Sequence, residues 1–260
     1  MTALIKKFRV KSYKRIKPIV SLKNVSLSYG KGHRVLDSIN LEIPKNSIVG
    51  LLGPNGAGKS SIMNLILGSV SPSYGNIYIR GINATNYPIY ERTTKFKLAI
   101  VPQRGGFFYD LDVESNLKAV GELVVPDEKE RLSRIDQLIA KFELDSVRKV
   151  LGRHLSGGMA RKLVIAMGLL RKPELLLLDE PLAALDLQSI AMLQSIICNL
   201  QTQSNITILI TDHQAASILS VVDSALILSN TKIVAQGSPQ AVLANPRAVS
   251  YFGKGFKLNQ

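Results

Sequence analysis

The chain has 260 residues, of which 46% are hydrophobic and 20% charged, as in an ordinary globular protein long enough to bury a sizeable core. No stretch reaches the roughly 18 consecutive apolar residues that a membrane-spanning helix needs. The single Cys198 excludes an internal disulfide framework and suits a reducing compartment, so we expect a cytoplasmic protein.

The formal net charge of +14 is concentrated at the start of the chain, where seven Lys and Arg among residues 1–18 supply half of it without any Asp or Glu. These charges interrupt every apolar run, unlike a secretory signal. The basic extension could contact anionic lipid headgroups, touch RNA non-specifically, or stay solvated with no partner. Nucleic acid is the least favoured partner, because no aromatic-interleaved recognition module accompanies the charge.

After this extension, short apolar segments alternate with turns. The pattern predicts strands, the last of them buried on both faces, at Ile19–Leu22, Val35–Ile43 and Ile48–Leu52. A helix is expected from Gly58 to Leu67, because Gly68 and a Ser-Pro turn follow it. A strand pair near Asn76–Arg80 and a short buried strand at Leu98–Val101 come next.

From about Gln103 to Lys172 helical periodicity dominates, notably over Lys129–Phe142 and Met159–Leu170. Strands are then predicted at Leu175–Leu178 and Ile206–Ile210, with a helix at Leu187–Gln201 between them. A hairpin follows, formed by Ala225–Leu228 and Lys232–Ala235. Strands that alternate with helices predict an α/β fold with a mainly parallel sheet core, an antiparallel β subdomain and an inserted helical subdomain.

This organisation predicts one large domain. We divide the chain into a basic extension (1–18) and a single domain (19–260). The domain consists of a core (19–102 and 173–240), a helical subdomain (103–172) and a C-terminal tail (241–260).

A complete phosphate-binding loop lies between the third strand and the first helix. The segment Gly53-Pro54-Asn55-Gly56-Ala57-Gly58-Lys59-Ser60 fits the pattern G-x-x-x-x-G-K-[ST]. Its glycines let backbone N–H groups surround phosphate oxygens at the positive end of the helix. Lys59 is expected to reach the β- and γ-phosphates and Ser60 to ligate Mg²⁺, with Ser61 beside it. The pattern therefore predicts ATP and Mg²⁺ as cofactors.

Two adjacent acids follow the apolar run Leu175–Leu178. They stand where a buried strand ends, at the sheet edge where ligands of open α/β sheets bind. Asp179 is expected beside Mg²⁺, and Glu180 is placed to orient or deprotonate the attacking water. An adjacent acid pair can also be a mere solvated turn, an interpretation that the P-loop in the same chain disfavours.

The segment Leu155-Ser156-Gly157-Gly158 resembles the signature motif of ABC ATPases, and it stands in the right order between the P-loop and the acids. A Ser hydroxyl and Gly N–H groups at a helix start can form a second anion site. In that family the site faces the γ-phosphate bound by another subunit. The resemblance therefore implies a homodimer that closes around two ATP molecules.

The resemblance implies further roles for residues that match the family in order. Gln103 resembles the glutamine that contacts Mg²⁺ and water, and His213 resembles the switch histidine that senses the γ-phosphate. Asp186, in Ala184-Leu185-Asp186, resembles the D-loop that crosses the dimer interface, and Tyr29 resembles the aromatic residue that stacks on adenine.

Two positions depart from the family's usual signature helix. Met159 stands where Gln or Glu is common, and Met167 stands where Arg is frequent. The chemistry of Ser156 and its two glycines is kept, but a polar contact at the helix start is lost. We expect ATPase activity to persist with an altered rate or dimer stability.

Within the family, the chain resembles the ATPase subunits of lipopolysaccharide-export transporters. The resemblance rests on Tyr90–Arg92, on Leu111–Leu117 and on the C-terminal segment Ala248–Leu258. It implies integral membrane partners that bind near Phe108 and a peripheral location on the cytoplasmic face of the inner membrane. In the export family basic residues follow this aromatic, whereas here Tyr109 and Asp110 do. ATPases of branched-chain amino-acid importers share much of the pattern and remain the main alternative.

Other classes of ABC ATPase fit less well. Chromosome-type relatives separate the P-loop from the acid pair by a very long coiled coil, whereas Lys59 and Asp179 are only 120 positions apart (179 − 59). Translation-type relatives carry two cassettes, and this chain has one. A regulatory module that no longer hydrolyses ATP is disfavoured because Glu180, Gln103 and His213 are all retained.

Overall fold

The computed structural model describes residues 17–30, 32–212 and 215–248. In this part of the chain the central element is a six-stranded sheet in the order β10-β9-β3-β8-β7-β6, parallel except for the antiparallel pair of β9 and β10. Its strands are β3 (Ile48–Leu52), β6 (Leu98–Val101), β7 (Leu175–Asp179), β8 (Thr207–Asp212), β9 (Ser224–Ser229) and β10 (Lys232–Gly237).

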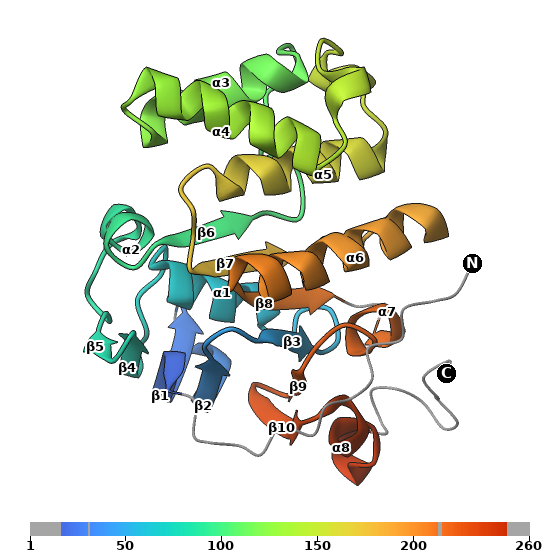
Figure 1. The fold of residues 1–260 in the computed structure, drawn as a ribbon. Coiled ribbons are helices and arrows are strands. Elements are labelled where there is room, and N and C mark those ends of the chain that lie inside the picture. The colour runs from blue at the N-terminus through green and yellow to red at the C-terminus, as the bar shows by residue number, and fades with distance from the viewer. Residues whose placement is uncertain (1–16, 31, 213–214, 249–260) are drawn as a thin grey trace.

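A second, antiparallel sheet has the order β2-β1-β4-β5. Its strands are β1 (Pro18–Tyr29), β2 (His33–Pro44), β4 (Tyr74–Ile79) and β5 (Ile82–Asn83). Helix α1 (Lys59–Leu67) lies between the two sheets (Figure 1), and one hydrophobic cluster joins it to both. The helix that carries the P-loop lysine is therefore held from both sides.

Successive side chains of the central strands point to opposite faces. In β7, Leu175 and Leu177 join the cluster around α1, whereas Leu176 and Leu178 join a second cluster on the other face. That face is covered by α5 (Gly157–Leu169), α6 (Leu187–Ser204) and α7 (Ala215–Leu219). A strand buried on both faces favours apolar residues along its length, which explains the unbroken run of leucines before Asp179.

The helical segment forms the top of the molecule in Figure 1. Helices α3 (Val113–Val124) and α4 (Glu128–Lys141) form a hairpin, each capped by an aspartate that accepts a backbone N–H. Two short 3-10 turns, Asp145–Val147 and Gly152–His154, lead to α5. Helix α5 packs against both α3 and β6, so it joins the hairpin to the central sheet.

The α/β fold with a mainly parallel core and an antiparallel sheet is confirmed, while several boundaries differ from expectation. Helix α5 begins two residues before Met159, because Ser156 caps it despite the low helix propensity of the two glycines. Strand β1 continues far beyond Leu22, since it pairs with two neighbours. The sequence did not specify the short helices α2 (Ile89–Lys95), α7 and α8 (Pro239–Leu243). No described helix is long and apolar enough to cross a membrane.

Candidate active site

The P-loop connects β3 to α1 and leaves the start of that helix without a side-chain cap. Gly58, the residue before α1, has a left-handed backbone (φ 103°), and no side chain accepts from the first N–H groups. A Cβ at Gly53 would lie 2.3 Å from the carbonyl oxygen of Leu228, so only glycine fits there. The exposed residues of the loop are Pro54, Asn55, Gly56 and Ser60, and Ala57, Gly58 and Ser61 are half-buried. The helix start is therefore open to an anion.

Lys59 is buried and folds back into this loop. Its Nζ donates to the carbonyl oxygens of Gly53 at 2.9 Å and Pro54 at 3.1 Å. Burial lowers the pKa of Lys59, and the carboxylates of Glu180, then Asp179 and Asp212, oppose that shift. A cation thus lies close to several acids, inside a loop that ends at the uncapped start of α1. This combination suits a bound anion better than a structural ion pair.

The acid pair stands at the carboxyl end of β7. Thr211 Oγ1, on the neighbouring strand β8, donates to Asp179 Oδ1 at 2.6 Å. The backbone N–H of Glu180 donates to the carbonyl oxygen of Thr211, and Glu180 itself has a left-handed φ of 43°. This uncommon conformation turns the chain sharply after the strand and leaves both carboxylates partly exposed at the sheet edge.

Gln103 reaches the same point from β6. Its Nε2 donates to Glu180 Oε2 at 2.7 Å. Because β6 pairs parallel with β7, residues that follow the two strands meet at one edge of the sheet. The structure therefore brings together Lys59, Asp179, Glu180 and Gln103, which come from three separate segments of the sequence.

Two residues of this edge were not identified as site residues from the sequence. Thr211 fixes Asp179, and the fully buried Asp212 accepts from the backbone N–H of Leu182 at 3.3 Å. Both end β8, next to the acid pair, so the position of Thr211-Asp212 after a predicted strand was the available signal. His213, which follows them, lies outside the described residues, as do residues 1–16 and 249–260.

Ser156 is exposed and caps α5, and its Oγ accepts the N–H of Met159 at 3.3 Å. Gly157 is also exposed, whereas Gly158 is buried at a place where a Cβ would lie 2.7 Å from Ser189 Oγ. Met159 is 38% exposed. Ser156 and Gly157 thus expose the positive end of a 13-residue helix to solvent, while Gly158 packs against Ser189 of α6.

Asp186 caps the adjacent helix α6. It accepts from the N–H and the hydroxyl of Ser189, and these hydrogen bonds lower the pKa of its carboxylate. The starts of α5 and α6 therefore adjoin, and Ser156 and Asp186 stand on neighbouring helix ends. Tyr29 is the last residue of β1 and is exposed, in a segment of the chain well before these helices.

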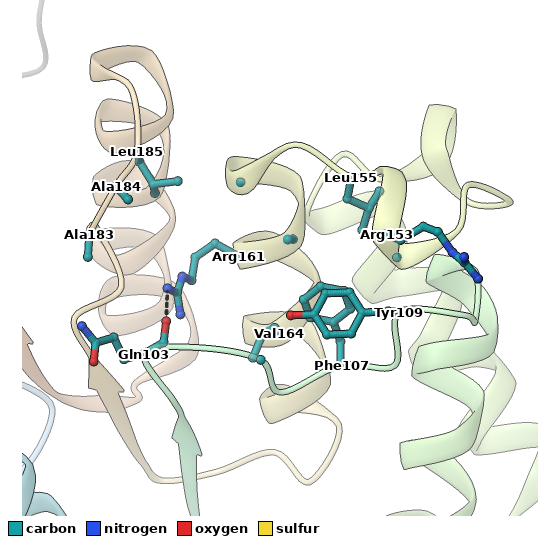
Figure 2. Close-up of a pocket in the computed structure, with 14 residues that line it drawn as sticks. Gln103, Phe107, Tyr109, Arg153, Leu155, Arg161, Val164, Ala183, Ala184 and Leu185 are labelled. Carbon is teal, nitrogen blue, oxygen red and sulfur yellow. Dashed lines mark hydrogen bonds between the residues drawn. The ribbon is translucent and has the colours of Figure 1, made fainter.

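A groove of about 320 Å³ runs between the segment after β6, the start of α5 and residues 183–185 (Figure 2). Phe107 and Tyr109 line it with rings 4.7 Å apart. Phe108 and Tyr109 are each more than half exposed, and Asp110 forms an ion pair with Arg153. This surface is aromatic, with one acid and one base at its rim.

Buried Asn116 fixes this aromatic segment from beneath. Its Oδ1 accepts the N–H of Phe108 at 2.6 Å, and its Nδ2 donates to the carbonyl oxygens of Phe108, Leu111 and Asp112. Both polar atoms of the Asn116 side chain are hydrogen-bonded to main-chain groups. The exposed ring of Phe108 therefore projects from a rigid backbone.

Comparison with known proteins places this chain in one family. A family model described as ABC transporter matches residues 36–183. The lipopolysaccharide export ATP-binding protein LptB of Haemophilus influenzae is 36% identical over 244 residues, which cover 92% of this chain and 99% of that protein. LptB of Escherichia coli K12 is 35% identical with the same coverage. A probable ABC transporter ATP-binding protein of Azorhizobium caulinodans is 36% identical over 89% of this chain and 82% of its own.

Solved structures share the fold at lower identity. The cbiO1 protein of Clostridium perfringens, part of an ABC transporter complex, superposes with a TM-score of 0.82 at 23% identity, over 90% of this chain and 94% of its own. A dimeric ATP-binding cassette in a post-hydrolysis state with ADP and phosphate gives 0.74 at 24% identity, over 85% and 98%.

Proposed function

The chain belongs to the ABC transporter family and is an ATPase subunit of that family, and from this premise we propose that it powers lipopolysaccharide export as a homodimer. Similarity to LptB over nearly the whole length of that protein supports the cargo. The Gln103–Glu180 contact, 2.7 Å long at the sheet edge and near buried Lys59, carries the catalytic part of the proposal.

The phosphates of ATP bind at the P-loop, 53–61. Lys59 exchanges its hydrogen bonds to the Gly53 and Pro54 carbonyls for phosphate oxygens, which are stronger acceptors for a desolvated ammonium group. The uncapped N–H groups of α1 add the helix's positive end. Tyr29, exposed at the end of β1, stacks on the adenine.

The donor set fits Mg²⁺ held jointly with phosphates. No group of three or more His, Cys, Asp and Glu side chains that could hold a metal exists in the described ranges. Ser60, Gln103 and Asp179 would supply oxygen ligands, and Mg²⁺ commonly takes its remaining ligands from phosphates and water. When bound, the ion neutralises charge that develops on the γ-phosphate.

Glu180 is the general base of hydrolysis. A water attacks the γ-phosphorus while the bond from that phosphorus to the bridging oxygen breaks, which yields ADP and phosphate. Glu180 accepts the proton that the water loses, and Gln103 holds the carboxylate from the side. His213, outside the described residues, steadies the γ-phosphate in this proposal.

A second copy completes each site. The start of α5 binds the γ-phosphate of the ATP held by the partner, through exposed Ser156 and Gly157 and the following Gly158. Asp186 lies at the adjacent start of α6. Closure of the dimer moves the groove beside Phe108, where a helix of an integral membrane subunit binds. The basic segment 1–18 reaches anionic lipid on the cytoplasmic face of the inner membrane.

A branched-chain amino-acid importer is the second candidate. The observation behind it is that Tyr109 and Asp110 stand where the export subunits have basic residues, so this surface departs from the export pattern. Asp110 is already paired with Arg153, so the rim offers less positive charge to a partner.

Affinity purification from solubilised membranes of the source cell tests the cargo. Recovery of the integral subunits of a lipopolysaccharide exporter would support the proposal, and recovery of importer subunits would replace it. A Phe108→Ala variant, in which the exposed ring is removed without touching the ATP site, should recover less of either partner.

A further inference from the structure

Arg161 ties the signature helix to the backbone of Gln103. It stands on α5, five positions after Ser156 (161 − 156), and is partly buried. Its Nη1 donates to the carbonyl oxygen of Pro102 and its Nη2 to that of Gln103, both at 2.7 Å. Figure 2 shows the guanidinium aimed at the main chain of Gln103 from across the groove.

The two accepting carbonyls flank the Cα of Gln103. A planar guanidinium that bonds both fixes the peptide groups on either side of this residue, and thereby the direction of its side chain. That side chain donates to Glu180. The path from Arg161 to the carboxylate of Glu180 thus consists of two short, directed hydrogen-bonded steps.

The electrostatic surroundings agree with a role at the site. Burial lowers the pKa of Arg161, while the carboxylates of Asp212 and Asp179 favour its charged form. A guanidinium is usually paired with a carboxylate when desolvated. Here the guanidinium of Arg161 donates to two main-chain carbonyls instead. Its contribution to the site is therefore to position the backbone of Gln103.

We propose that Arg161 is a positioning residue for ATP hydrolysis, which holds Gln103 against Glu180 and links that contact to the helix that begins at Ser156. This rests on the proposed roles of Gln103 and Glu180. The effect of Arg161 passes through Gln103 alone.

Purified full-length protein with Mg²⁺-ATP tests the proposal through an Arg161→Met variant. Since a misplacement of about 1 Å can cost ~100-fold, kcat should fall between about tenfold and a hundredfold. ATP affinity should stay within about twofold, because the P-loop is untouched. Arg161→Lys, which keeps the charge but cannot span both carbonyls, should have an intermediate kcat.

Arg134→Met is the matched control. Arg134 also donates to a main-chain carbonyl, that of Leu170 at 2.6 Å, but it binds the far end of α5. Its loss should change thermal stability as much as the loss of Arg161 while kcat stays near normal. Equal losses of kcat in both variants would reduce Arg161 to a structural contact and overturn the proposal.

The decisive measurement is a double-mutant cycle with Gln103→Ala. If Arg161 acts through Gln103, the double variant is no slower than the slower single variant. Additive losses, or a Gln103→Ala variant with full kcat, would overturn the proposal.

A Glu180→Gln variant in the same assay distinguishes a failure of the proposed catalytic site from a failure of the positioning role of Arg161. Full turnover in Glu180→Gln would refute the proposed site itself. An inactive Glu180→Gln beside a normal Arg161→Met would leave the site standing and refute only the positioning role.

Discussion

The side-chain amide of Gln103 donates a 2.7 Å hydrogen bond to the carboxylate of Glu180, 77 positions later in the chain. The contact exists because β6 and β7 are parallel neighbours that end at the same edge of the sheet. It joins the segment that leads to the exposed aromatic surface with the acid at the strand end. A movement of the segment after β6 would therefore shift Gln103 and change its hydrogen bond to Glu180.

Replacement of the proposed base should separate ATP binding from hydrolysis. Glu180→Gln is expected to lower kcat by about 100-fold or more while ATP still binds, because the amide cannot accept the water's proton. Phosphate release and size-exclusion chromatography with ATP should then show a trapped dimer. Glu174→Gln is the control: Glu174 precedes the same strand and binds Lys45, Arg80 and Lys97. A fully active Glu180→Gln would show that the base lies elsewhere.

Loss of the P-loop lysine should act on binding itself. Lys59→Ala is expected to weaken ATP affinity roughly tenfold to a hundredfold, as the loss of a charge-assisted hydrogen bond would. Isothermal titration calorimetry without turnover measures this directly. Lys45→Ala removes an exposed lysine instead and should bind ATP normally. Unchanged affinity in Lys59→Ala would contradict the role.

The fully buried Arg92 should be a determinant of stability. It donates to four main-chain carbonyls, those of Leu65 and Ile66 at the end of α1 and those of Thr85 and Tyr87. Burial lowers the pKa of Arg92 to about 10, so it stays charged at neutral pH. Arg92→Met leaves these four carbonyls without their hydrogen-bond donor and should lower the free energy of unfolding by about 2–4 kcal/mol.

Urea unfolding measures that loss, and Arg34→Met, at an exposed ion pair, should cost far less. A similar small cost at both positions would mean that water replaces Arg92 without penalty. The end of α1 would then be less dependent on this residue than its contacts indicate.

The buried Glu114 should make stability depend on acid. Arg148, then Lys118 and Lys149, donate to its carboxylate and keep its pKa well below the ordinary value of a glutamate. The unfolded chain therefore takes up this proton first as the pH falls. The stabilisation from the ionised group is fully present above about pH 5 and is lost progressively below it.

Glu114→Gln should consequently be less stable than the parent at pH 7, with the difference shrinking toward acid pH. Urea unfolding at pH 7 and at pH 4 measures both values. Glu122→Gln, on the exposed side of the same helix, is the control. A difference between parent and Glu114→Gln that does not change with pH would show that the ionised group is not what stabilises the fold.

The sequence by itself determined the features that lie within a few consecutive residues. The P-loop, the two acids after four leucines, and the Ser-Gly-Gly helix start each combine a local backbone requirement with a chemical group. Gly58 is needed by the left-handed backbone of the loop itself, whereas the close approach of the Leu228 carbonyl to Gly53 also depends on where β9 packs. The apolar runs of β3 and β7 also followed directly, because a strand covered on both faces favours a nearly continuous apolar sequence.

Only the tertiary structure decided how these pieces cooperate. Arg161 and Arg92 bind main-chain carbonyls of distant segments, and a carbonyl is present at every residue, so no side-chain pattern marks the acceptor. Thr211 meets Asp179 because β8 is placed beside β7, which depends on strand order. Such contacts arise from packing between elements, and the physical reason that they escape the sequence is that spacing along the chain carries no information about which elements become neighbours.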